Sequence, residues 1–137
     1  MSEAALSLKM DRDWQTLADC VEQVRGFTSA YDLGERARYV LELVLEEILS
    51  NAVRHVPAGE RRGVGVTVTV CGRGVSVMFE DRGVPFDPTF EAEQREGLSG
   101  DEHGGFGLHL VRNFVDAWEY SRQDGQNTLT VEIEGGS

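Results

Sequence analysis

Two polar residues spaced one helical turn apart fall on the apolar side of an amphipathic segment. The stretch "LELVLEEILSNAVRHV" (41–56) repeats apolar residues at steps of three and four, which predicts a helix. A rotation of about 100° per residue places Asn51 and His55 inside its apolar arc and Glu47 at the border of that arc. Burying an unpaired carboxylate or amide costs roughly several kcal/mol. These side chains therefore need internal partners or a cavity.

The chemistry of this pair fits phosphoryl transfer. The neutral amide oxygen of Asn51 suits a hard Mg²⁺ ion that is already surrounded by phosphate oxygens. Glu47 could remove the proton from a hydroxyl or water that attacks a terminal phosphate. The alternative is that Asn51 and His55 lie where the helix frays into solvent and Glu47 only reaches toward water. From the same rotation per residue we expect Glu42, Glu46 and Arg54 to lie on the opposite, solvated face.

A second polar feature stands at the end of an alternating segment, in "VMFEDRGVPFDP" (77–88). The carboxylate of Asp81 can accept a hydrogen bond from an exocyclic amine such as that of adenine. Gly83 leaves room for a flat ring against the backbone, and Pro85 and Phe86 would fix the turn and wall a pocket. An ordinary turn explains the same residues, because Asp, Gly and Pro are common in turns.

Glycines open a later helical segment in "HGGFGLHL" (103–110). Glycine there lets backbone N–H groups approach a phosphate, and the positive end of the helix favours its charge. No Lys-Ser/Thr pair follows, so the segment is not a Walker A loop. It is not a Rossmann fingerprint, because a polar loop precedes it. As a lone cluster it also fits a hinge. The three glycines are Gly104, Gly105 and Gly107.

These features follow one another within about sixty residues, in the order that a nucleotide pocket requires. The elements that must position them can be read from periodicity. The expected order is a strand at "AALSLKM", a helix after the cap Asp13, the long helix from about Gly34 to Val56, and a hairpin turning at Gly72 to Gly74. A polar loop, a helix and a hairpin turning at Asp124-Gly125 complete it.

This order predicts an α+β fold in which about three helices form one layer over a mostly antiparallel or mixed sheet of about five strands. A chain of 137 residues with 40% hydrophobic and 27% charged residues fits a single domain over 1–137. The polar segment 87–103 is too long for a simple connection and is expected to be a lid or binding loop.

Charge and cysteine content exclude several classes. The net charge of −11, with Lys9 as the sole lysine, argues against nucleic acid or an anionic membrane as the main partner. A small phosphate ligand stays compatible, because a helix N-terminus and a metal supply local positive potential. Two distant cysteines, no signal-peptide pattern and no apolar run long enough to span a bilayer predict a reduced cytoplasmic protein.

In this context the sequence resembles the GHKL, or Bergerat-fold, ATPase superfamily, and within it the bacterial anti-sigma-factor serine-protein kinases. The segment "EEILSNAVRH" resembles the N box, "EDRGVPFDP" the G1 box, and "GGFGLHLVRNFVD" the G2 box. The likeness spans nearly the whole chain, which is expected to be a complete switch-kinase module. The "PFD" sequence favours the anti-sigma group over sensor histidine kinases.

The resemblance implies a role for each matching residue. Glu47 would be the general base, Asn51 a Mg²⁺ ligand, and Asp81 the reader of adenine with Gly83 beside the ring. The segment 87–103 would be a mobile ATP lid, and Thr128 would support the adenine through Asp81 or water. The implied phosphate-binding residues are Gly104, Gly105 and Gly107.

The resemblance also implies a function. The chain is expected to bind ATP and Mg²⁺, to phosphorylate a serine or threonine of an anti-sigma-factor antagonist, and to bind a sigma factor. A homodimer is implied by the resemblance alone. Phosphoryl transfer needs cations near the terminal phosphate, yet the lid offers only Arg95, and His103 precedes the glycines. The alternative is therefore a nucleotide-gated module without catalysis that sequesters a sigma factor or another regulator.

Overall fold

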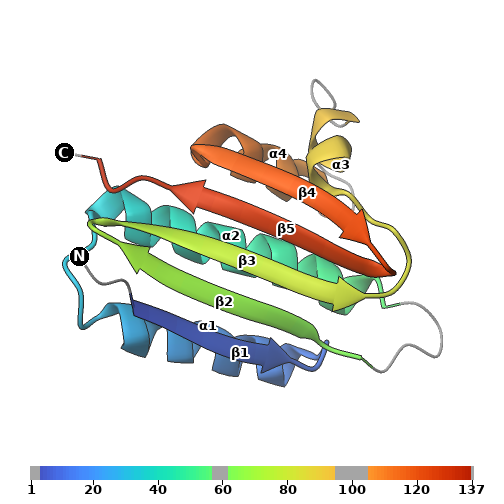
Figure 1. The fold of residues 1–137 in the computed structure, drawn as a ribbon, viewed down its shortest axis with the longest axis horizontal. Coiled ribbons are helices and arrows are strands. Elements are labelled where there is room, and N and C mark those ends of the chain that lie inside the picture. Colours follow the sequence, from blue (N-terminus) through green and yellow to red (C-terminus); the bar gives the residue numbers. More distant parts are fainter. Residues whose placement is uncertain (1–3, 57–61, 95–104, 137) are drawn as a thin grey trace.

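The computed structural model describes residues 4–56, 62–94 and 105–136. It shows two layers, with helices covering one face of a single five-stranded sheet (Figure 1). The strands are β1 (Ala4–Met10), β2 (Val64–Cys71), β3 (Gly74–Arg82), β4 (Ala117–Gln123) and β5 (Gln126–Ile133). The helices are α1 (Trp14–Thr28), α2 (Glu35–Arg54), α3 (Pro88–Gln94) and α4 (Gly105–Phe114).

The sheet has the order β1-β2-β3-β5-β4, and every neighbouring pair of strands is antiparallel. The expected α+β fold is thus confirmed, although the described sheet is fully antiparallel rather than mixed. In the central pair, Asp81 lies opposite Asn127 and Glu80 opposite Thr128. This register determines which residues of β5 lie beside the end of β3.

The last hairpin turns where the sequence predicts. Asp124 and Gly125 both have positive φ values, of 53° and 79°. Two central residues with positive φ define the turn whose twist matches that of a two-residue hairpin. The turn fixes the register of β5 against β4 and thereby determines which β5 side chains face the helices.

The core lies between α2 and the sheet. The apolar side of α2 is buried at Val40, Leu41, Val44 and Leu45, as the helical spacing predicts. The inward faces of β2 and β3 meet it with Val66, Val68, Val75 and Val77. Within the described ranges, no helix combines the length and the apolar character needed to cross a bilayer.

The described residues contain a fourth, short helix beside the expected three, because the first part of the segment expected to be a loop is helical. Asp87 caps α3: its Oδ1 atom accepts hydrogen bonds from the backbone N–H groups of Thr89 at 2.9 Å and Phe90 at 3.3 Å. Pro88 takes the first helical position, where its missing N–H is not needed. An Asp-Pro pair is a known helix start. The rest of the expected lid, 95–103, lies outside the described residues.

Candidate functional site

One wall of the candidate site is the inner side of α2 near its C-terminal end. Asn51 is only 7% exposed, and its Nδ2 atom finds no hydrogen-bond partner among the described residues. Its Oδ1 atom accepts one long hydrogen bond, of 3.3 Å, from Nη2 of Arg54. His55, which sequence spacing turned inward, is exposed at the helix end but still lines the adjoining cavity. Asn51 is therefore a buried amide with unused hydrogen-bonding capacity.

A cavity of about 190 Å³ opens beside this wall. Asn51, Asp81 and Gly83 all line it, so the structure brings together three residues separated by up to 32 positions in the chain. Apolar side chains supply much of the remaining lining, from Ile48, Phe79, Leu129, Val84 and Phe86. Whole-ligand pockets are typically several hundred Å³. A cavity of this size suits one flat group such as a nucleobase, with the rest of a ligand extending beyond it.

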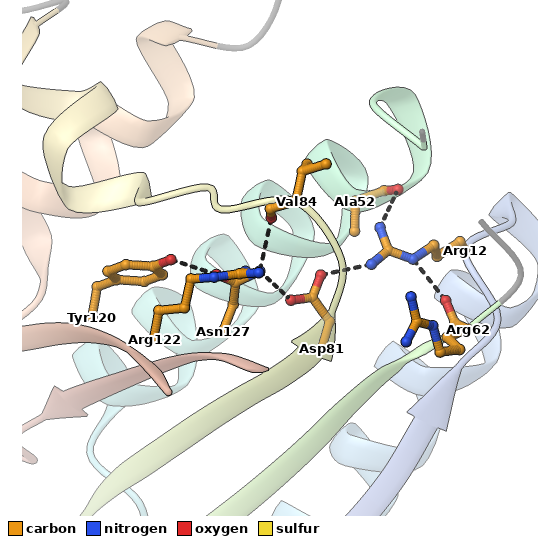
Figure 2. A network of polar contacts seen from close by, with 8 residues as sticks. All are labelled: Arg12, Ala52, Arg62, Asp81, Val84, Tyr120, Arg122 and Asn127. Carbon is orange, nitrogen blue, oxygen red and sulfur yellow. Dashed lines mark hydrogen bonds and ion pairs between the residues drawn. The ribbon is translucent and has the colours of Figure 1, made fainter. Parts of the chain in front are cut away.

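Asp81 lies at the centre of a polar network at one end of the cavity (Figure 2). Its Oδ2 atom is 2.6 Å from Nη2 of Arg12, and its Oδ1 atom accepts from Nδ2 of Asn127 at 2.9 Å. The Arg12 side chain is 7% exposed and that of Asp81 is 23% exposed. The carboxylate is therefore held on both oxygens while part of it still faces the cavity.

Asn127 also joins the strand end to its neighbours. Its Nδ2 atom donates to the carbonyl oxygen of Val84 at 3.0 Å, and its Oδ1 atom accepts from Arg122 at 3.0 Å and from the hydroxyl of Tyr120. Thr128, by contrast, is one residue further along β5 and so points to the opposite face of the sheet. There its hydroxyl lies 3.4 Å from Nε2 of Gln126. The structure does not bring Thr128 to Asp81.

Glu47 lies one turn before Asn51 and meets the start of α4. A Cβ atom placed on Gly107 would lie 1.7 Å from Oε1 of Glu47, so only glycine permits this approach. Burial raises the pKa of the Glu47 carboxyl above its ordinary value; the positive charge of Arg54 opposes the rise and the negative charge of Glu46 adds to it. The structure thus brings the candidate base against a candidate phosphate-binding glycine. Glu47 does not line the base-sized cavity.

Arg54 is solvated as expected, but the expectation that it lies on the face of α2 opposite Glu47 is wrong. Seven residues after Glu47 correspond to nearly two full turns, so the two side chains share one side of the helix. Arg54 is exposed, but its guanidinium reaches Asn51 at 3.3 Å and acts electrostatically on Glu47. Arg54 is thus a cation beside Asn51 and Glu47, in addition to Arg95 and His103, which lie outside the described residues.

Two of the expected glycines have a described position. Gly105 begins α4 and Gly107 lies in its first turn, where backbone N–H groups are free of helix partners. Gly104, like His103 and Arg95, lies outside the described residues. The phosphate-facing role of the glycines therefore rests on Gly105 and Gly107.

The donor set fits Mg²⁺ only as a shared ligand. Among the described residues, no three His, Cys, Asp or Glu side chains gather closely enough to hold a metal ion. The buried amide of Asn51 supplies one oxygen, which in the described part of the chain accepts a single long hydrogen bond. Mg²⁺ is commonly bound by one or two protein groups together with substrate phosphates and water. Asn51 fits that pattern and would hold a metal only together with a phosphate ligand.

Sequence reasoning missed Arg12 and Asn127. Asn127 could have been found, because it alternates in phase with Leu129 and Val131 and is a polar residue on the inward face of a strand. Arg12 left no such signal. It precedes α1 and meets Asp81 across 69 positions.

Comparisons with known proteins agree with the fold and the motifs. A model of the histidine kinase-like ATPase domain matches residues 12–133. A protein of Bordetella bronchiseptica named serine/threonine-protein kinase BtrW is 35% identical over 99 residues, and the match covers 70% of each sequence.

Two solved structures share the fold. The RsbU and RsbW domains of Rv1364c from Mycobacterium tuberculosis match 96% of this chain with a TM-score of 0.68 and 18% identity, and this chain spans 32% of that one. Acinetobacter baumannii histidine kinase AdeS matches 96% of this chain and 68% of its own, with a TM-score of 0.52 and 16% identity. At these identities the two structures show similarity of fold alone.

Proposed function

The chain belongs to the family of histidine kinase-like ATPase domains, and from this premise we propose that it is an ATP-dependent serine/threonine protein kinase of the anti-sigma-factor type. One observation carries the proposal: Asn51, Asp81 and Gly83 line one cavity, and Glu47 lies one turn away against Gly107. The named kinase activity of the Bordetella relative supports the same reaction class.

The base-sized cavity is the proposed adenine site. The carboxylate of Asp81 would accept a hydrogen bond from the exocyclic amine, and Gly83 would leave room for the ring. The apolar side chains of Ile48, Phe79 and Leu129 would enclose its faces. The triphosphate would then extend along α2 toward Asn51 and the first turn of α4.

The phosphate end combines three kinds of group. The N–H groups of the α4 start would bind phosphate oxygens, and the amide oxygen of Asn51 would hold Mg²⁺, which would neutralise charge developing on the transferred group. Arg54 would contribute a positive charge beside them. Because its hydrogen bond to Asn51 is long, at 3.3 Å, little is lost when the guanidinium turns from the amide to a phosphate.

Glu47 is the proposed general base. Its carboxylate would take the proton of a substrate serine or threonine hydroxyl as that oxygen attacks the terminal phosphorus of ATP. The bond to the β-phosphate oxygen breaks, ADP leaves and a phosphoserine or phosphothreonine forms. The raised pKa of Glu47 makes it a stronger base than an ordinary glutamate.

The regulatory context follows from the resemblance to anti-sigma-factor kinases. The proposed substrate is an anti-sigma-factor antagonist, and the proposed second partner is a sigma factor that this chain sequesters in the cytoplasm. Homodimerisation belongs to the same proposal. The acidic net charge of −11 supports protein partners rather than nucleic acid.

A second candidate function is a nucleotide-gated binding module without turnover. The observation that favours it is the low number of cations at the phosphate end. Among the described residues, Arg54 is the one cationic side chain that contacts Asn51 and acts on Glu47. In this version ATP binding changes partner affinity without turnover.

Label transfer separates the two candidates. The purified chain is incubated with radiolabelled ATP, Mg²⁺ and the antagonist-type protein encoded beside it. The kinase proposal predicts labelled antagonist, lost in Glu47→Gln and kept in Glu46→Gln, a neighbouring exposed residue. The binding-module alternative predicts no label but ATP-dependent complex formation that survives Glu47→Gln and is lost in Asp81→Asn. Failure to bind ATP at all contradicts both.

A further inference from the structure

Arg12 is a nearly buried side chain that connects several segments around the site. Its guanidinium donates to three segments: Oδ2 of Asp81 at 2.6 Å, the carbonyl oxygen of Arg62 at 2.8 Å and that of Ala52 at 3.4 Å. The side chain is 7% exposed. One residue therefore joins the start of α1, the end of α2, the approach to β2 and the end of β3 (Figure 2).

The backbone of Arg12 supports a specific role for this side chain. Arg12 has a φ value of 64°, in the left-handed region where a residue other than glycine is strained. Glycine would adopt that conformation without strain. A strained backbone at a site residue indicates that the side chain contributes something the surrounding structure requires.

Asn127 holds the other oxygen of the same carboxylate, and it has no capacity left for a ligand. Its two N–H groups donate to Asp81 and Val84, and its carbonyl oxygen accepts from Tyr120 and Arg122. Each carboxylate oxygen of Asp81 accepts one bond from this network and retains a further acceptor site. Of Asn127 and Asp81, Asp81 is therefore the residue that can still accept a hydrogen bond from a ligand in the cavity.

We propose that Arg12 and Asn127 are positioning residues that hold the Asp81 carboxylate in the orientation that selects a nucleobase with an exocyclic amine. The inference rests on the proposed ATP site and names what sets its base specificity. Arg12 binds Oδ2 and Asn127 binds Oδ1 of Asp81. Rotation of the carboxylate would therefore break at least one of these hydrogen bonds. Without them the carboxylate would rotate and pair with water, and the amine would lose its fixed acceptor.

A purely structural ion pair makes a different prediction. If Arg12 only held segments together, its loss would weaken the binding of every nucleotide alike. If it positions Asp81, its loss would weaken only ligands that carry the amine. Purine riboside triphosphate separates the two cases, because it differs from ATP by the absence of the 6-amino group.

The experiment measures the dissociation constants of ATP and purine riboside triphosphate by calorimetry for the whole chain and its variants. Wild type should prefer ATP by about 10- to 100-fold, the range of one hydrogen bond to a charged acceptor. Arg12→Met and Asn127→Leu should reduce that preference to about 3-fold or less while leaving the affinity for purine riboside triphosphate unchanged. Arg12→Lys keeps a donor for Asp81 and should restore part of the preference.

Arg73→Met is the matched control. Arg73 is an exposed arginine in the β2–β3 turn, and it pairs weakly with Asp32 at 3.7 Å. This variant should keep the wild-type preference.

The outcomes are distinct. An unchanged preference in Arg12→Met, or an equal loss for both nucleotides, overturns the inference while the proposed ATP site stands. No binding of either nucleotide by wild type overturns the proposed function itself. Circular dichroism checks folding. If Arg12→Met does not fold, Arg12→Lys decides: a preference equal to that of wild type contradicts the inference, and a reduced preference supports it.

Discussion

The two ends of the site differ in how their polar groups are paired. At the base end, both oxygens of Asp81 and all the hydrogen-bonding groups of Asn127 have protein partners. At the phosphate end, Nδ2 of Asn51 has no partner among the described residues, and burial raises the pKa of Glu47. The base end is held by its own contacts, whereas the phosphate end keeps one buried donor, Nδ2 of Asn51, without a partner in the described part of the chain, beside a half-buried carboxyl group.

In the proposed function, the base end recognises the nucleotide and the phosphate end carries out the phosphoryl transfer. A network that is complete without a ligand fixes its acceptor in advance and reduces the ordering cost of binding. Unsatisfied buried polar groups cost stability and are uncommon in native proteins. Among the described residues Nδ2 of Asn51 is such a group, and the proposed ligand would give it a partner. The base end should therefore control affinity, and the phosphate end should control rate.

The largest expected effect tests the rate side of this contrast. Glu47→Gln removes the carboxylate that is proposed to take the proton and keeps nearly the same shape. The rate constant of label transfer at saturating ATP should fall about 10²- to 10⁴-fold. The KM for ATP should change little, because Glu47 does not line the base cavity. A rise in KM as large as the fall in the rate constant would contradict the distinction between the two ends.

The second prediction compares stability at the two ends in the absence of nucleotide. Asp81→Ala leaves the nearly buried guanidinium of Arg12 without its carboxylate, which should cost about 2 to 4 kcal/mol. Asn51→Leu removes an amide whose Nδ2 atom lacks a partner among the described residues and whose Oδ1 atom accepts one long hydrogen bond, and should leave stability unchanged or slightly raised. Urea denaturation of both variants measures the difference. A greater loss for Asn51→Leu would contradict the view that the base end is the stabilised one.

The third prediction concerns the junction of Glu47 with α4. Gly107→Ala introduces a methyl group where Oε1 of Glu47 lies 1.7 Å away, so the carboxylate must move. A small displacement of a reacting group should lower the transfer rate by about 10-fold, with ATP affinity reduced less.

Gly26→Ala in α1 is the matched control for that change. It lies in a helix with nothing within 4 Å of the added atom, and should raise stability by up to about 1 kcal/mol through helix propensity. Activity should then be unchanged. A transfer rate in Gly107→Ala equal to that of wild type would show that Glu47 does not need its observed position.

Local patterns predicted the elements and one wall of the site. Strand alternation, helical spacing and the Asp-Gly turn depend on neighbours in sequence, so they fixed the helix that carries Glu47 and Asn51 and the hairpin that ends at Asp81. The Asp-Pro start of α3 was equally local but was interpreted as a loop. Arg54 was assigned to the wrong side of α2. Its spacing of seven residues from Glu47 is nearly two full turns, which already placed it on the same side as Glu47.

Contacts between distant segments could not be predicted in the same way. Thr128 and Asn127 are adjacent in β5, yet they point to opposite faces, and only the register opposite Asp81 and Glu80 decides which one enters the cavity. Arg12 reaches Asp81 because a left-handed residue turns the chain before α1. Neither fact follows from composition or periodicity.

The smallest expected effect is a pH dependence of stability that arises at the phosphate end. Because burial raises the pKa of Glu47, the native state holds this proton more tightly than the unfolded chain. Between the unfolded and the native pKa the native state binds more protons, so stability falls as pH rises through that window. At neutral pH the ionised carboxylate is thus a net cost to the fold.

Glu47→Gln should therefore be more stable than wild type at pH 7, and its advantage should disappear as pH falls below the ordinary glutamate range, where both states of the wild type hold the proton. Thermal unfolding from pH 8 to pH 4 measures the difference, with Glu46→Gln as the exposed neighbour for comparison. An advantage independent of pH would assign the gain to packing rather than charge. A loss of stability at pH 7 would mean that contact with the α4 start outweighs burial, and that the phosphate end, like the base end, is satisfied by its own protein contacts.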